Sequence, residues 1–426
     1  MFNSKSIFLG LALGFALYSC EQDNFAPAAD NDPAAEFAAS DDLLAIEQEE
    51  NDYLKLDASI AIDEDALLTK LGYGEYLAED DSKSVNRRPQ IYTLSNSPAG
   101  NEVILFQSNE DGTITEAGRF ATGGTGTGGG LGNQGAIAVN LRARQLWAVN
   151  PGDNSLSLFF IFPDGTLELL DTAPTNGDTP VSVTVFENVA YVVHSGSDDI
   201  AGFRQSLFQG DIRPIAGSVQ QLSSTGTAPA QISFKRNGRV LIVTEKATNA
   251  ITTFQVDGLG RSSNRRTFTS AGETPFGFDL ANRARIVVSE AARGVEGAGT
   301  VSTYRVRNNG RVSLVDGPVT LNETAACWVA LNRRNGQVFV TNTGSDSASS
   351  LNLDLESGAL TLNAAVTATG DAPLDADLNR DGSYLYVLTS GDDALQTFRV
   401  AADGSLQLID TDGGLPDGAT GVFVRR

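Results

Sequence analysis

Two glutamates stand at the ends of short apolar segments, where a carboxylate could do chemistry. Glu245 follows residues 241–244, and Glu290 follows residues 286–289. A half-buried carboxylate can act as a general base, because desolvation raises its pKa toward neutrality. A structural role is the alternative, in which each carboxylate accepts backbone N–H groups and fixes the adjacent loop. Glu245 and Glu290 are therefore candidate catalytic residues, with the anchoring role left open.

His194 is the only histidine among the 426 residues, and it ends a third segment of the same type. Other segments of this type end in Asn, Thr or Ser, which favours a hydrogen-bonding role for His194 over catalysis. A single imidazole with no partner evident in the sequence makes neither a catalytic triad nor a metal site. We keep His194 as a binding candidate and expect no metal and no cofactor.

Residues 124–135 contain the spacing GxGxxG twice. A nucleotide-binding fingerprint needs a helix directly after its glycines, and no helical pattern follows here. We expect instead a pliable loop that crosses a channel mouth and could act as a lid. Residues 377–382 begin like a calcium loop, but position twelve is Leu388 where a bidentate Glu is required. That segment is expected to be a hairpin turn.

Seven apolar segments, each ending in a polar residue, recur from residue 89 onward. Their last residues are Ser95, Asn150, His194, Glu245, Glu290, Asn342 and Thr389, which lie 44 to 55 residues apart. A second strand pattern follows each segment, a third that begins with glycine often comes next, and a short strand with small residues precedes most of them. Four short strands in a period of about 45–50 residues predict an all-β fold, a seven-bladed β-propeller.

The first repeat lacks the preceding small-residue strand, and residues 418–424 carry that pattern at the C-terminus. We expect this C-terminal strand to complete the first blade and close the ring, which leaves no sheet edge exposed. The inner strand of a blade starts, and the next strand ends, at the same mouth of the channel. The binding candidates therefore gather at one mouth, with Gln134, Gln231, Phe276 and Trp328 on the rim and Asn342, His194, Glu245 and Glu290 just outside.

The first twenty residues read as an export signal. Lys5 supplies a positive charge, residues 7–17 are apolar but too few to span a membrane, and small Ser19 precedes Cys20. The pattern predicts a lipoprotein signal peptide over residues 1–19, with lipid on Cys20; an ordinary secretory signal cut near Cys20 is the alternative. We therefore expect an exported lipoprotein at the outer membrane or cell surface, attached to the membrane through Cys20.

The charge is strongly negative and unevenly spread. The chain carries 53 acidic and 30 basic residues, a formal charge of −23. Residues 21–88 alone hold 19 acidic and 5 basic residues, which is typical of a solvated tether. We expect residues 20–88 to be an acidic tether, partly disordered, and residues 89–426 to be the propeller. Such a surface repels phosphate backbones, so nucleic acid is not an expected partner, and we expect a monomer.

Residues 89–426 resemble the lactonase-type seven-bladed propellers, the family of 6-phosphogluconolactonase and the propeller muconate-lactonising enzymes. The blade pattern and the segments 228–231, 244–249, 274–278, 289–291 and 325–329 carry this resemblance. It implies lactone chemistry and matches a family carboxylate to Glu245. The sugar-lactone branch has an Arg-His pair where this chain has Ala230-Gln231, and a His where Thr179-Pro180 stands. The resemblance therefore implies a neutral lactone or no catalysis.

Two functions follow from these residues. As an enzyme, the protein would hold a lactone or sugar-like ring at the mouth, with Glu245 activating water and Gln231 and Asn342 holding the carbonyl oxygen. As a non-catalytic surface module, it would bind a glycan or a protein, with Phe276 and Trp328 as an aromatic platform.

Overall fold

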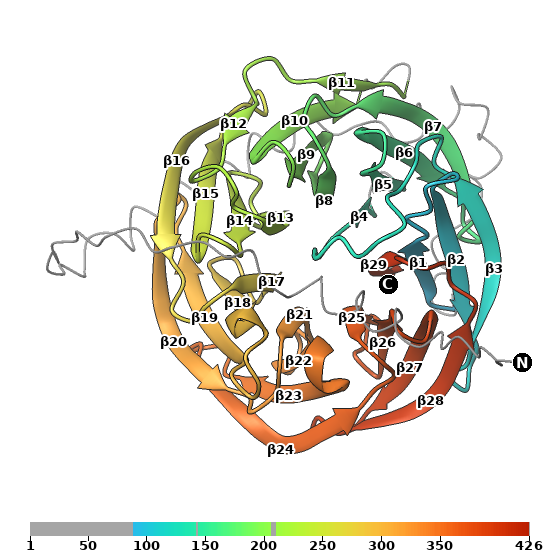
Figure 1. The fold of residues 1–426 in the computed structure, drawn as a ribbon, viewed down its shortest axis with the longest axis vertical. Coiled ribbons are helices and arrows are strands. Elements are labelled where there is room, and N and C mark those ends of the chain that lie inside the picture. Colours follow the sequence, from blue (N-terminus) through green and yellow to red (C-terminus); the bar gives the residue numbers. More distant parts are fainter. Residues whose placement is uncertain (1–87, 142–143, 206–209, 426) are drawn as a thin grey trace, which may run out of the picture. The chain divides into compact units, whose positions relative to one another are not determined.

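The computed structural model describes residues 88–141, 144–205 and 210–425, which form seven antiparallel sheets arranged in a ring (Figure 1). Each sheet is one blade, and six of the seven blades have four strands. The predicted all-β, seven-bladed propeller is confirmed. The expected signal peptide, Cys20 and most of the tether lie outside the described residues.

The strands of each blade run from the ring centre outward in the order inner, second, third and outer. The inner strands, in chain order, are β4 (Ile137–Asn140), β8 (Pro180–Phe186), β13 (Pro229–Phe234), β17 (Pro275–Leu280), β21 (Ala326–Leu331), β25 (Pro373–Leu378) and β29 (Thr420–Arg425). The second strands are β1 (Gln90–Leu94), β5 (Gln145–Asn150), β9 (Val189–His194), β14 (Val240–Glu245), β18 (Arg285–Glu290), β22 (Gln337–Asn342) and β26 (Tyr384–Thr389).

The third strands are β2 (Glu102–Ser108), β6 (Ser155–Ile161), β10 (Asp199–Gln205), β15 (Ala250–Val256), β19 (Thr300–Val306), β23 (Ser347–Leu353) and β27 (Ala394–Val400). The outer strands are β3 (Ile114–Ala121), β7 (Leu167–Pro174), β16 (Ser262–Thr269), β20 (Val312–Thr320), β24 (Leu360–Ala368) and β28 (Leu406–Gly413). In the third blade two short strands, β11 (Ile212–Pro214) and β12 (Gln220–Gln221), both pair with β10 instead. Two short 3-10 turns, η4 (Ala292–Gly294) and η5 (Thr343–Ser345), complete the elements of the residues that the structure describes.

We number the blades 1 to 7 in the order of their second strands, β1, β5, β9, β14, β18, β22 and β26. These strands are the seven apolar segments that the sequence predicts, and β5, β14 and β22 are buried at every residue. Both faces of a second strand pack against neighbouring blades, which explains why its sequence is continuously apolar rather than alternating. The outer strands face solvent, as in β16, whose middle residues are all exposed.

The ring closes as expected. Strand β29 pairs antiparallel with β1, with Val424 opposite Ile91 and Val422 opposite Thr93. The C-terminal strand thus supplies the inner strand of blade 1, whose sheet order is β29-β1-β2-β3. No described residue belongs to a helix long and apolar enough to cross a membrane.

Repeated side-chain contacts join each blade to the next. Asn154 has a φ of 60°, in the left-handed region that Asn tolerates well, and its Oδ1 accepts the backbone N–H of Thr179 at 2.7 Å. Asn249 has a φ of 55° and accepts the N–H of Thr274 at 2.9 Å in the same way. Each contact fixes the residue just before an inner strand, so these turns set where the inner strands start.

Because the strands of a blade alternate in direction, the ring has two distinct faces. The loop face carries the connections from each outer strand to the next inner strand, such as residues 270–274, and those between second and third strands. The turn face carries the hairpins between inner and second strands and between third and outer strands. Lys235 lies in the hairpin between the inner and second strands of blade 4. It contacts Asn308, which lies in the hairpin between the third and outer strands of blade 5. The expected turn at 377–382 is one of these hairpins.

Candidate functional site

Glu245 lies at the end of β14, fully buried, with hydrogen-bond donors at both carboxylate oxygens. Its Oε1 accepts the backbone N–H of Ser223 at 3.2 Å. Its Oε2 accepts the hydroxyl of Thr248 at 2.7 Å and also the hydroxyl of Ser223. These donors tie β14 to the connection that leads from blade 3 into blade 4. The contacts are those that the anchoring alternative predicts.

Glu290 occupies the same position in blade 5 and is also fully buried. Its Oε1 accepts the hydroxyl of Tyr304 at 2.8 Å and the N–H of Gly272 at 3.1 Å. Its Oε2 accepts the hydroxyls of Thr300 at 2.7 Å and Ser302 at 2.9 Å. Glycine is required at position 272, since a Cβ there would lie 2.3 Å from the Glu290 carboxylate. This carboxylate therefore joins a third strand to the loop that precedes an inner strand.

His194 and Asn342 lie in the equivalent positions of blades 3 and 6, and both are fully buried. His194 Nδ1 lies 2.7 Å from Asp199 Oδ1 on β10. Asn342 Nδ2 donates to the hydroxyls of Ser347 at 3.1 Å and Ser349 at 2.9 Å on β23. The hydrogen-bonding role favoured for His194 agrees with this geometry. The four side chains sit in four separate blades, each bonded to its own third strand or to the neighbouring connection.

Replacement of Glu290 by Gln should destabilise the propeller by about 1–3 kcal/mol, because an amide cannot accept all the bonds that the buried carboxylate accepts. Chemical denaturation measures the change in the free energy of unfolding. Glu296→Gln, at an exposed position on the same face, is the matched control and should change stability by less than about 0.5 kcal/mol. Equal effects of the two substitutions would show that Glu290 anchors nothing.

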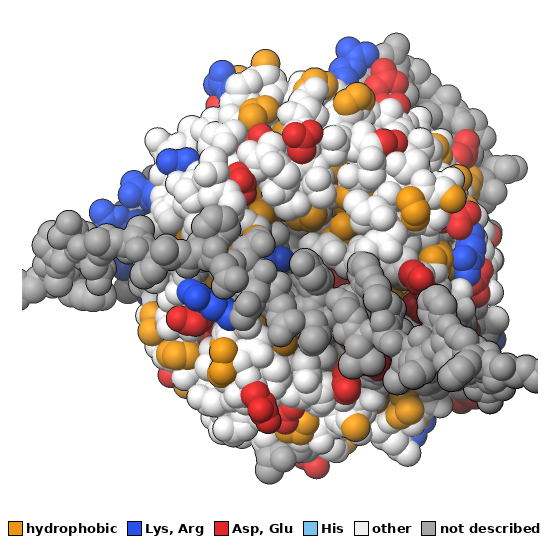
Figure 2. Space-filling view, viewed as in Figure 1, with side chains coloured by type: hydrophobic (Ala, Val, Ile, Leu, Met, Phe, Trp, Pro, Cys, Tyr) orange, Lys and Arg blue, Asp and Glu red, His pale blue; other side chains and the backbone are white. Residues whose placement is uncertain are grey.

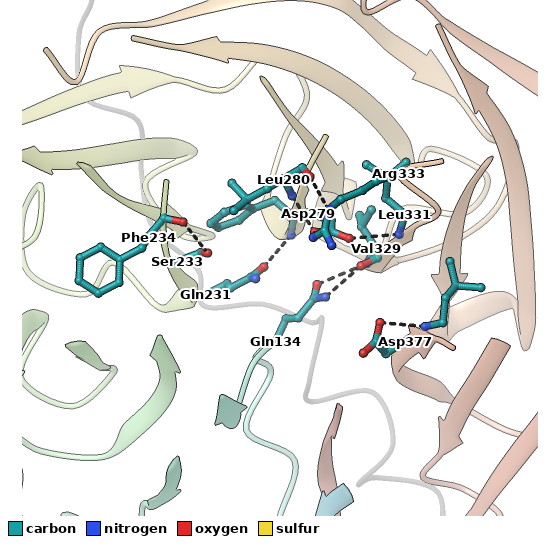
Figure 3. Close-up of polar contacts among 12 residues, drawn as sticks. Gln134, Gln231, Ser233, Phe234, Asp279, Leu280, Val329, Leu331, Arg333 and Asp377 are labelled. Atoms are coloured by element: carbon teal, nitrogen blue, oxygen red, sulfur yellow. Dashed lines mark hydrogen bonds and ion pairs between the residues drawn. The ribbon is translucent and has the colours of Figure 1, made fainter. Parts of the chain in front are cut away.

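The glycine-rich connection between blades 1 and 2 runs to the centre of the ring, as the sequence suggests (Figure 1). We call residues 132–135 the channel segment. Gln134 crosses to blade 6, where its Nε2 donates to Val329 O at 3.0 Å and its Oε1 accepts Val329 N–H at 3.3 Å (Figure 3). Its own N–H donates to Ala230 O of blade 4 at 2.9 Å. The segment therefore spans the channel from one side to the other.

Asn133 and Gly135 extend these contacts to further blades. Asn133 donates through its amide to Val181 O of blade 3 and accepts the hydroxyl of Thr420 of blade 1 at 3.1 Å. Gly135 O accepts the N–H of Val183 in blade 3 at 2.9 Å. The channel segment is consequently a fixed part of the ring, and Asn96 holds Gly128 N–H and Gly129 O just before it.

The side chain of Gln134 fits because blade 5 carries no side chain at the facing position. A Cβ on Gly277 would lie 1.9 Å from Gln134 Oε1. Gln231 lies close by in blade 4, where its Oε1 accepts the N–H of Phe278 at 2.6 Å (Figure 3). Gln231 therefore joins blade 4 to blade 5 rather than presenting a free amide oxygen at the mouth.

Phe276 and Trp328 pack against each other, with ring centroids 4.8 Å apart and planes inclined at 60°. Both are buried, at 0% and 2% exposure, within one apolar cluster. Trp328 Nε1 donates to Asn133 O at 2.5 Å. The two rings thus form a packed support for the channel segment rather than an open aromatic platform.

Lys246 is a cation at this mouth that sequence reasoning missed. It directly follows Glu245, and its Nζ lies 4.9 Å from the centroid of the Phe276 ring, in a cation–π arrangement. The same ammonium donates to Gly132 O at 2.5 Å. Lys246 and Trp328 therefore direct N–H donors at two successive carbonyl oxygens of the channel segment, above Phe276.

Asp375 is a second missed residue. It lies on β25 and is 3% exposed, and its Oδ2 accepts the N–H of Val422 at 3.2 Å and that of Gly135 at 3.5 Å. Burial raises the pKa of Asp375 to about 7, against the lowering effect of these backbone donors. A carboxyl group that titrates near neutrality inside a channel is a candidate functional group. Asp375 thus contacts the same channel segment as Trp328 and Lys246.

A comparison with protein families decides the assignment. The sequence model of the family described as Lactonase, 7-bladed beta-propeller, matches residues 99–223, 187–327 and 287–423. The chain belongs to this lactonase family. Its members share the fold described here, and family membership by itself does not assign a substrate.

Solved structures with the same fold as this lactonase-family protein include two bacterial propellers. One, from Bacteroides fragilis and provisionally described as a 6-phosphogluconolactonase, is 17% identical with a TM-score of 0.64, over 80% of this chain and 98% of that one. The other, a periplasmic gluconolactonase of Pseudomonas aeruginosa, is 14% identical with a TM-score of 0.61, over 78% and 98% of the two chains. No curated protein matches the sequence. At these identities the likeness shows the fold alone.

The structure therefore brings together only some of the predicted site residues. Gln134, Phe276 and Trp328 meet at the channel segment, and Gln231 lies close by on the inner strand of blade 4. Glu245, Glu290, His194 and Asn342 lie inside their own blades, and Cys20 is outside the described residues. Lys246 could have been found as the charged residue after the end of β14. Asp375 holds the third position of its inner strand, which Gln231 holds in blade 4.

Proposed function

We propose that the loop-face mouth of this lactonase-family propeller binds a lactone or sugar-like ring and hydrolyses its ester bond. The donor pair of Lys246 and Trp328 carries this proposal. In the structure both donors hold peptide carbonyl oxygens, and the carbonyl oxygen of a cyclic ester can accept the same kind of bond. A bound ring takes the place of Gly132 O at Lys246 and of Asn133 O at Trp328, while the side-chain bonds of Gln134 to Val329 keep the segment attached.

Hydrolysis also needs a group that accepts a proton from the attacking water, after which the ring C–O bond breaks and a hydroxy acid forms. Glu245, the base that the sequence suggested, already accepts donors at both of its oxygens. Both oxygens of Asp375 also accept backbone N–H groups, but its pKa of about 7 suits a general base near neutral pH. We therefore assign the proton-accepting role to Asp375 in this proposal, with Glu245 as the alternative.

The test is hydrolysis of a panel of lactones, from neutral aldonolactones to phosphorylated ones, with Lys246→Met as the decisive variant. Loss of a charge-assisted hydrogen bond should raise KM about 10- to 100-fold. Thermal stability should fall modestly, because Lys246 also contacts Gly132 O and the Phe276 ring in the folded protein. Arg293→Met is the matched control, because it removes one positive charge from the same face at a 63% exposed side chain. If no lactone is hydrolysed, or both variants behave alike, the proposal is refuted.

A non-catalytic binding module is the second candidate, and one observation favours it. The two carboxylates that the sequence offered as catalytic candidates, Glu245 and Glu290, have every oxygen engaged by donors in their own blades or in the adjoining connections. A protein that binds glucono-lactone or a neutral sugar in a Lys246-dependent way without turnover would fit this second function.

A further inference from the structure

Basic residues are concentrated in one part of this acidic protein. Residues 204–334 carry 17 basic and 9 acidic side chains, whereas residues 89–203 and 335–426 together carry 7 basic and 25 acidic ones. The basic part comprises blades 4 and 5 and adjoining strands of blades 3 and 6. In Figure 2 blue side chains gather at the edge of the ring where Figure 1 places β16. The propeller is therefore electrostatically two-sided, although its total charge is negative.

Most of this positive charge lies in the hairpins of the turn face. Six arginines in the hairpins of blades 4, 5 and 6 are exposed, namely Arg236, Arg261, Arg283, Arg307, Arg311 and Arg334. We call them the basic turn face. Acidic side chains are fewer in these hairpins. One of them is Asp257, whose Oδ2 lies 2.8 Å from Arg261 Nη2.

The loop face of the same blades has the opposite character. Its connections carry Glu273, Glu296, Glu323 and Asp346 against Lys246 and Arg293. At physiological ionic strength the Debye length is about 8 Å, so a partner that meets the turn face experiences the local arginines rather than the distant acidic blades. Charge alone would thus orient the propeller on an anionic surface.

An apolar side chain stands among these arginines. Leu259 lies at the tip of the hairpin 257–261 and is 59% exposed, the largest value among the large apolar side chains of the described ranges. Arg204 Nη2 donates to Leu259 O at 2.8 Å, which holds the tip in place beside a further cation. An exposed leucine beside Arg204 and Arg261 has the composition of protein surfaces that lie on lipid headgroups.

The N-terminal part of the chain joins the propeller at this same face. Gln90, the first residue of β1, lies opposite Arg425, the last residue of β29, and its amide contacts Pro163 in the hairpin 162–166 of blade 2. That hairpin belongs to the turn face. The first described residues therefore enter blade 1 at the turn face.

We propose that the basic turn face, together with Leu259, binds a bilayer that contains anionic lipids. The arginines contact the phosphate groups of the headgroups, and Leu259 enters the boundary between headgroups and acyl chains. This orientation directs the loop-face mouth away from the bilayer, toward solvent. The proposal is independent of any catalytic activity at that mouth.

Nucleic acid and acidic polysaccharide fit the turn face less well. Single strands bind to aromatic stacking platforms, and no aromatic residue is among the strongly exposed apolar side chains in the described ranges. Duplex nucleic acid is a stiff rod that would extend over the acidic blades on either side. An acidic polysaccharide would make no use of an exposed leucine. A fluid bilayer uses both the arginines and Leu259.

The experiment uses the chain from Glu21 onward, which keeps every described residue and lacks Cys20. It is sedimented with vesicles of phosphatidylcholine alone or with one quarter phosphatidylglycerol. We expect binding to the anionic vesicles only, with reversal at 0.5 M salt, roughly as screening of exposed charges predicts. Arg236→Glu combined with Arg334→Glu should weaken binding about tenfold or more, and Leu259→Ser should weaken it about threefold.

Arg119→Glu combined with Arg293→Glu changes the net charge equally at positions outside the basic turn face and is the matched control. It should bind like the unaltered chain. Equal weakening in both double variants, equal binding to neutral vesicles, or binding to soluble polygalacturonate without vesicle binding would each overturn the proposal. Circular dichroism of all variants shows that the β fold is retained.

Discussion

Asp375→Asn should remove most of a stability loss that the unaltered protein shows between pH 4 and pH 8. Burial raises the pKa of this carboxyl group from 3.8 to about 7 in the folded state. The unfolded chain releases the proton near pH 4, whereas the folded chain keeps it until about pH 7. Over that interval the folded state binds the extra proton, so its stability falls as the pH rises and levels off above pH 7.

The expected size of this loss is about 4 kcal/mol, since one pKa unit corresponds to about 1.4 kcal/mol and the shift is about three units. Asparagine stays neutral at every pH and keeps an oxygen for the N–H of Val422 or Gly135. Asp375→Asn should therefore be more stable than the unaltered chain at pH 8 and no more stable at pH 4. Denaturant titrations at several pH values measure this directly.

Glu110→Gln, at an exposed position, is the control for the change in net charge. It should leave the slope of stability against pH unaltered. If Asp375→Asn has the same slope as the parent, the carboxyl group does not titrate in the folded protein near neutrality.

Asp375→Asn also tests the catalytic proposal, because activity and stability should depend on pH in opposite ways. A base with a pKa near 7 is active when ionised, so the rate of lactone hydrolysis should rise with pH through about 7 while stability falls. Removal of a positioned base typically reduces kcat by about 10²–10⁴-fold. Glu245→Gln should instead lower stability, because it removes an anchor. A large fall in kcat in Glu245→Gln with no fall in Asp375→Asn would return the catalytic role to Glu245.

The fold could be predicted closely because its signal is local and repeated. The segment that ends at Glu245 was predicted as a strand, and β14 ends at that residue. Residues 418–424 were predicted as the closing strand, and β29 spans Thr420–Arg425. A strand buried on both faces must be apolar throughout, so the second strands are visible in the sequence without any knowledge of their partners.

The site could be predicted only in part because its contacts join distant parts of the chain. Lys246 meets Gly132, and Trp328 meets Asn133, across more than a hundred residues in each case. Glu245 could be placed at the end of a strand, yet its donor Ser223 belongs to the connection from the preceding blade. Whether a carboxylate is a free base or an engaged anchor depends on such donors, which no local pattern reveals.

The contacts of Gln134 could not be predicted from the sequence for the same reason. Gly277 leaves the space that Gln134 fills, and the sequence identifies both as residues near inner strands without indicating that they meet. The glycine-rich connection was expected to cross the mouth, and it does so, while its role as a lid stays a prediction. Its last residues turn out to be bonded to inner strands of several blades, which only the folded ring can show.

A chain that ends at Pro416, without β29, should lose cooperative folding of the whole propeller. The deletion removes the pairing of β29 with β1 and the buried side chains of Val422 and Val424. Burial of two valines contributes about 3–6 kcal/mol, and each lost backbone hydrogen bond adds about 1 kcal/mol. The total approaches the 5–15 kcal/mol that typically separates folded from unfolded domains.

Two carboxyl groups of blade 7, buried Asp375 and half-buried Asp377, make this loss larger than pairing alone would predict. Asp375 accepts Val422 N–H at 3.2 Å, and Asp377 accepts Val424 N–H at 2.9 Å. Without β29 these carboxylates lose donors, and blade 1 presents an open strand edge that favours aggregation. Thermal unfolding followed by circular dichroism measures the effect, with a chain that ends at Arg425 as the control. A cooperative transition within a few degrees of that control would show that the ring does not depend on the C-terminal strand.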